Sequence, residues 1–111
     1  MDRSFSIILG ACTLFSSALV QASAGWTDYV TVAELTSTGH HYYKISLPVK
    51  ENPSGCKDKT WFYQDYSSFG SDKMFQMMLE GVKSRLRVRV YVTGKCNLDG
   101  YSEISSVSVI P

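Results

Sequence analysis

The stretch Arg85-Leu-Arg-Val-Arg-Val-Tyr-Val92 decides the fold of this 111-residue chain. Apolar and polar side chains alternate through it without a break, which is typical of a β-strand buried on one face. Its inward face consists of Leu86, Val88, Val90 and Val92, and its outward face of Arg85, Arg87, Arg89 and Tyr91. The stretch therefore predicts a long strand with an apolar inner face.

The hydrophobic period changes just before this strand. Between Ser71 and Lys83 the apolar residues recur at helical spacing, which predicts one amphipathic helix. Ser71 is the expected N-cap residue, because its hydroxyl can accept a backbone N–H of the first turn. The expected inward stripe consists of Met74, Phe75, Met78, Leu79 and Val82.

Further strands are expected on both sides of the helix. β-Branched and aromatic residues bounded by turn formers indicate them. They cover Tyr29–Leu35, Tyr42–Leu47, Trp61–Tyr63 and Tyr101–Ile110, and the first two form a hairpin across Ser37-Thr38-Gly39. In the last strand the apolar residues change face, which predicts a bulge near Ser105-Ser106.

The predicted order is three strands, one helix and two strands. This order is typical of a mainly β, five-stranded OB-like Greek-key barrel with one α-helix between strands 3 and 4. A ferredoxin-like fold would need a second helix, which the sequence does not offer. An open α+β sheet is the alternative.

The N-terminal 24 residues have the pattern of a secretory signal peptide. Arg3 precedes an apolar run from Phe5 to Val20, and Ala22-Ser23-Ala24 provides small residues for cleavage after Ala24. The run is too short to span a membrane, so no transmembrane segment is expected. We expect residues 25–111 to form a single periplasmic or secreted domain. A lipoprotein signal, which would lipidate Cys12, is the alternative.

Two cysteines remain after removal of the leader. In an oxidising compartment Cys56 and Cys96 are expected to form one disulfide. The sequence contains no C-x-x-C spacing, and its two histidines, His40 and His41, are adjacent in an expected turn. Neighbouring residues in an extended chain point to opposite sides, so no metal site and no cofactor are expected.

The outward face of the long strand is the first candidate for ligand binding. Three guanidinium groups on one face could hold carboxylate, sulfate or phosphate groups bidentately. Nearby aromatic side chains could add stacking surface for a sugar. The candidate residues are Arg85, Arg87, Arg89, Tyr91, Trp61, Tyr63 and Tyr66. The alternative is a solvated strand face that carries arginines for solubility.

Other function classes are less compatible with the sequence. Nucleic acid is not expected as a partner, because the net charge is only +1 and the chain is expected to be exported. No G-x-S-x-G elbow or comparable signature selects a nucleophile, so we do not expect an enzyme. A small periplasmic enzyme is kept as a minority alternative.

Four features together carry a family resemblance: the export signal, Trp26 early in the mature chain, Gly55-Cys56 and Gly94-Lys95-Cys96. The layout resembles small exported bacterial OB-fold proteins, among them the B subunits of pentameric toxins such as subtilase cytotoxin. The resemblance implies glycan binding and a ring of five, and it transfers no pocket residue to this chain. We therefore expect a disulfide-bonded binding protein for a protein or anionic glycan ligand. A ring-forming, receptor-binding toxin subunit is the alternative.

Overall fold

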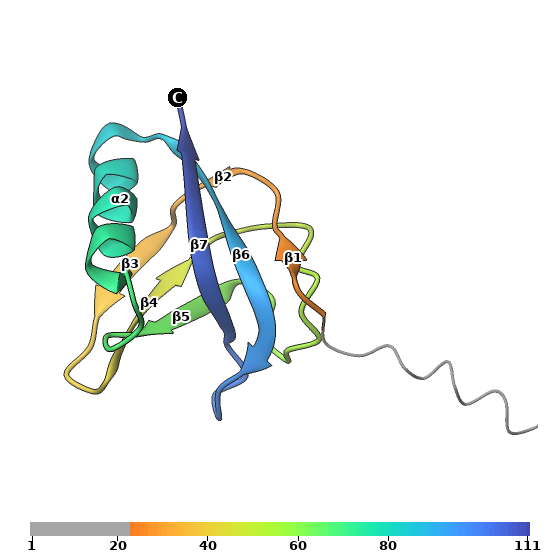
Figure 1. Cartoon of the computed structure of the whole chain (residues 1–111). Coiled ribbons are helices and arrows are strands. Elements are labelled where there is room, and N and C mark those ends of the chain that lie inside the picture. The colour runs from red at the N-terminus through yellow and green to blue at the C-terminus, as the bar shows by residue number, and fades with distance from the viewer. Residues whose placement is uncertain (1–22) are drawn as a thin grey trace, which may run out of the picture.

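The computed structural model describes residues 23–111 (Figure 1). The expected leader lies outside these residues except for Ser23 and Ala24, and so does the alternative lipidation site at Cys12. The Ser23 hydroxyl donates a hydrogen bond to the Pro53 carbonyl at 3.1 Å. The start of the described chain is thus tied to the loop that precedes the disulfide.

The described chain is a mainly β domain with one helix. Its elements are β1 (Gly25–Trp26), β2 (Val30–Thr31), β3 (Glu34–Ser37), β4 (Tyr42–Ser46), β5 (Trp61–Asp65), α2 (Ser71–Ser84), β6 (Arg87–Cys96) and β7 (Ser102–Ile110). The strand order is β1-β6-β7-β5-β4-β3, with β2 also paired to β6. The β5–β7 pair is parallel and every other pair is antiparallel. In Figure 1 the long β6–β7 pair crosses β4 and β5, and α2 stands beside β7.

The structure has seven strands where the sequence predicted five. The expected strand Tyr29–Leu35 is divided into β2 and β3, because its first part pairs with β6 and its second part with β4. One segment that serves two partners must bend between them, which breaks the ladder at Val32-Ala33. The short strand β1 was not predicted, and it pairs Gly25 with Val92.

The long strand starts later than predicted. Arg85 ends the helix with a left-handed backbone at φ 56°, so neither it nor Leu86 belongs to β6. The predicted inner face is otherwise confirmed, since Val88, Val90 and Val92 are buried. The bulge is confirmed too, because the β6–β7 register shifts from Tyr91↔Ser106 to Val92↔Ile104.

The helix lies where it was predicted, but two details differ. Gly70 is the residue before the first turn and no side chain caps it, whereas Ser71 donates its hydroxyl proton to the Tyr66 carbonyl at 2.8 Å. Within the expected inward stripe Met78 is buried, while Leu79 and Val82 are exposed. The helix covers the core with a narrower face than its apolar pattern predicted.

The core is mostly apolar, and a hydrogen-bonded pair, Tyr43 and Gln64, lies within it. Tyr43, Ile45 and Leu47 are buried together, which confirms the predicted inner face of β4. The Tyr43 hydroxyl donates to Gln64 Oε1 at 2.7 Å, and the amide nitrogen of Gln64 donates to the Ile104 carbonyl at 3.3 Å. These contacts join β4, β5 and β7 inside the domain.

Replacement of Tyr43 by phenylalanine is expected to lower the free energy of unfolding by about 1–3 kcal/mol, because buried Gln64 Oε1 loses its donor. Urea denaturation of both proteins measures the difference. Tyr66→Phe is the matched control, because it also removes a hydroxyl that donates a hydrogen bond. The Tyr66 side chain is exposed, so its partner, the Thr38 carbonyl, can accept a hydrogen bond from water instead. Equal losses in the two variants would contradict the role of the buried pair.

The disulfide between Cys56 and Cys96 is confirmed, with the two Cα atoms 5.6 Å apart. It joins the loop before β5 to the last residue of β6. The loop that follows, residues 97–101, therefore begins directly after a residue that is held by a covalent bond.

Candidate functional site

A groove of about 480 Å³ opens between two connections that are far apart in the sequence. One wall is the turn between β3 and β4, represented by His41, and the other is the loop between β6 and β7. Between them lie tyrosines of β4 and β5. The lining residues are His41, Tyr42, Tyr63, Asp65, Lys95, Cys96, Asn97, Leu98, Asp99 and Glu103, and we call this site the tyrosine groove.

Strand alternation places the tyrosines in the groove. Along β4, Tyr43 and Ile45 are buried inside, so Tyr42 between the turn and the core must point outward. Along β5 the same alternation directs Phe62 to the core and Tyr63 to the opposite side of the sheet, where the Tyr63 ring, although itself buried, meets that of Tyr42 edge to face at 5.8 Å. Two neighbouring strands thus present two tyrosine rings on one outer face.

Hydrogen bonds and a glycine hold the loop wall. Asn97 Oδ1 accepts the backbone N–H groups of Asp99 and Tyr101 at 3.0 and 2.9 Å. Gly100 has a φ of 85°, and a Cβ there would lie 3.0 Å from the Cβ of Lys57. This position therefore requires glycine, and the loop is ordered before any ligand arrives.

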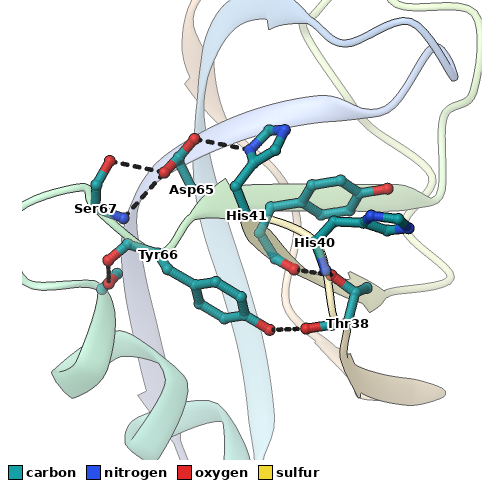
Figure 2. A network of polar contacts seen from close by, with 8 residues as sticks. Thr38, His40, His41, Asp65, Tyr66 and Ser67 are labelled. Atoms are coloured by element: carbon teal, nitrogen blue, oxygen red, sulfur yellow. Dashed lines mark hydrogen bonds and ion pairs between the residues drawn. The ribbon is translucent and has the colours of Figure 1, made fainter.

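A polar network fixes the opposite wall, and Figure 2 shows it. His41 Nδ1 lies 3.0 Å from Asp65 Oδ2, while Asp65 Oδ1 accepts the Ser67 backbone N–H and hydroxyl at 2.9 and 2.7 Å. The Ser67 hydroxyl, its backbone N–H and then His41 lower the pKa of Asp65, in that order of effect. The Tyr66 hydroxyl donates to the Thr38 carbonyl at 2.7 Å. The network ties the β3–β4 turn to the end of β5.

The tyrosine groove is acidic. Three carboxylates line it, those of Asp65, Asp99 and Glu103, against one ammonium group, that of Lys95. Burial first, and then the charges of Glu103 and Asp65, raise the pKa of Tyr63. A negatively charged ligand would be repelled at this site.

The structure does not bring the three predicted arginines together as a site. Arg85 lies at the end of the helix, and Arg87 donates to the Pro111 carbonyl at 3.1 Å. The guanidinium of Arg89 lies 4.2 Å from the ring centroid of Trp26 and 4.8 Å from that of Tyr29. The guanidinium groups of Arg87 and Arg89 thus already contact other residues of the chain, and Arg85 belongs to the end of α2 rather than to β6.

The predicted aromatic residues are separated as well. Tyr91 packs edge to face on Trp26 beside Arg89, and Trp61 stacks on Tyr101. Tyr66 belongs to the turn network, so Tyr63 is the one predicted residue that lines the tyrosine groove. The sequence reasoning missed Tyr42, Asp65, Asn97, Asp99 and Glu103. The outward position of Tyr42 and the turn pattern Asn97-Leu-Asp-Gly100 were the available signals.

Residues 23–111 contain neither a cluster of metal-ligating side chains nor a helix that could cross a membrane. They hold no group of three or more histidine, cysteine or acidic residues placed to bind a metal ion. Their helix is too short and too polar to cross a bilayer. A comparison of the chain with protein-family models, curated proteins and solved structures finds no match.

Proposed function

We propose that the chain is an exported, OB-like binding protein that recognises a glycan in the tyrosine groove. The position of the groove carries this proposal. OB folds bind oligonucleotides and oligosaccharides on the face of their second and third strands, between the loop that joins strands 1 and 2 and the loop that joins strands 4 and 5. The tyrosine groove lies on β4 and β5 between residues 38–41 and 97–101, and in an OB-like barrel these strands would correspond to the second and third, which supports the proposal.

Strand pairing supports the OB-like barrel. The segment 30–37 pairs with β6 through β2 and with β4 through β3, so it links the two ends of the path β4-β5-β7-β6. An OB barrel closes in this way, with its first strand shared between the second and the fourth. The parallel β5–β7 pair and the single helix after β5 agree with that topology.

Size and lining favour a glycan among the ligands of this fold. A volume of about 480 Å³ is typical of small-molecule sites. Tyrosine rings can stack on the apolar face of a sugar, while Asn97 and the carboxylates can bond its hydroxyl groups. The carboxylates oppose a phosphate backbone, which argues against nucleic acid.

The polar network supports binding without catalysis. A serine hydrolase needs the serine hydroxyl on the histidine and the carboxylate behind that histidine. Here the Ser67 hydroxyl bonds Asp65 rather than His41, so the serine is not the nucleophile of a triad. The network instead supports a fixed wall for the groove. The disulfide supports export to a periplasmic or extracellular compartment, where such bonds persist.

Tyr42→Ala is expected to weaken glycan binding at least tenfold, because a stacking ring of the groove is lost. Glycan-array binding followed by calorimetry on the best ligand measures the effect. Tyr91→Ala is the matched control, since Tyr91 is also a half-buried tyrosine on an outer strand face in an edge-to-face contact. If Tyr91→Ala abolished binding and Tyr42→Ala did not, the site would lie on the arginine face.

A further inference from the structure

Two of the three acidic groups of the tyrosine groove, Asp99 and Glu103, have no cationic partner within the described residues. The ion pair found there joins His41 to Asp65. Glu103 accepts one hydrogen bond, from the Thr93 hydroxyl at 2.8 Å, and the Asp99 side chain accepts none from residues 23–111. Two carboxylates therefore face the groove with unused acceptor capacity.

The cations near the groove leave this charge uncompensated. The ammonium of Lys44, the neighbour of Tyr63 on β4, lies over the Trp61 ring, 4.8 Å from its centroid, and 5.7 Å from that of Tyr101. Lys95 lines the groove but comes within 4.0 Å of no carboxylate of the described chain. One ammonium thus faces three carboxylates.

Tyr63 provides an independent observation. Its side chain lines the groove with only 8% of the residue exposed, yet its hydroxyl makes no hydrogen bond to any described residue. Most of this side chain is buried, while the hydroxyl oxygen itself stays in contact with solvent at the groove. Burial first, and then the charges of Glu103 and Asp65, raise the pKa of this hydroxyl above its ordinary value, so at neutral pH it is protonated and can donate a hydrogen bond. A ligand in the groove would satisfy it.

We propose that the glycan carries an unacetylated amino group, whose ammonium binds the carboxylates of Asp99 and Glu103 while a sugar oxygen bonds the Tyr63 hydroxyl. Ammonium groups form charge-assisted hydrogen bonds with carboxylates, and tyrosine rings also attract cations. An acidic sugar lacks the first interaction and is repelled. This inference rests on the proposed function and names the ligand class for the same groove.

The test is calorimetry of the disulfide-bonded protein with three oligosaccharides of equal length. These are a glucosamine tetramer, the N-acetylglucosamine tetramer, and a tetrasaccharide that ends in sialic acid. We expect the glucosamine tetramer to bind at least tenfold more tightly than its acetylated counterpart, and the affinity to fall with added salt. The sialylated sugar is expected to bind most weakly.

Glu103→Gln is expected to reduce the affinity for the glucosamine tetramer about tenfold, and to leave that for the acetylated tetramer unchanged. Glu80→Gln is the matched control, because Glu80 also accepts one serine or threonine hydroxyl but lies on α2 away from the groove. Asp99→Asn, on an exposed loop residue, is a second variant that should act like Glu103→Gln without disturbing the strands.

Each outcome separates the inference from the proposed function. Equal affinity for the glucosamine tetramer and the N-acetylglucosamine tetramer would overturn the amino-group inference and leave glycan binding in place. Binding to a lysine-rich peptide, with no affinity for any of the sugars, would overturn both. Preference for the sialylated sugar would overturn the inference and support the anionic glycan that the sequence analysis expected.

Discussion

A chain in which Cys56 and Cys96 are both replaced by alanine is expected to lose about 4 kcal/mol of its free energy of unfolding. The bond joins residues separated by 40 positions, and a loop of that length strongly restricts the unfolded chain. Domains of this size have about 5–15 kcal/mol in total. The variant should therefore retain only about 1 kcal/mol if the original protein lies at the lower end of this range.

Chemical denaturation of the oxidised protein and of the double variant measures the loss. Addition of a reductant serves as the control, because it should destabilise the original protein and leave the double variant unchanged. A loss below about 1 kcal/mol would mean that the unfolded chain is already restricted without the bond. We also expect weaker ligand binding in the variant, because Cys96 directly precedes the loop wall of the tyrosine groove.

Phe62→Ala is expected to lower the free energy of unfolding by about 3–5 kcal/mol. Phe62 lies on β5 with 0% of its surface exposed, in the cluster that joins the strands to Met78 of α2. Its removal leaves a cavity that the close-packed neighbours cannot fill.

Phe69→Ala is the matched control for this change. Phe69 is 100% exposed in the connection between β5 and α2, so the same substitution should alter stability by no more than about 0.5 kcal/mol. Thermal and urea denaturation of the two variants give the comparison. Similar losses at both positions would contradict the assignment of Phe62 to the core.

The sequence predicted local features well, because a helix or strand that is buried on one face shows a characteristic spacing of apolar residues. The inner faces of β4 and β6, the span of α2 and the bulge in β7 all follow from neighbouring residues, and the disulfide follows from the two cysteines of the expected mature chain. The division of Tyr29–Leu35 into two strands does not. The division depends on which strands pair with each part of the segment, and the sequence of the segment alone does not specify those strands.

The candidate site was harder to predict for the same reason. Its walls combine residues near positions 41, 65 and 97–103, which only the pairing of β4, β5 and β7 brings together. The spacing of the arginines along β6 was read correctly for Arg87 and Arg89. What the spacing could not reveal is that Trp26 and Tyr29 already cover the guanidinium of Arg89.

The pairing of β1 bears on the timing of maturation. The bond expected to be cut joins Ala24 to Gly25, and Gly25 pairs with Val92 of β6. Ser23, two residues before Gly25, lies close to Gly94. Peptidases act on accessible, loosely held backbone rather than on paired strands. If the expected leader is cleaved there, cleavage would have to come before β1 pairs with β6, because afterwards residues 92–94 shield the bond.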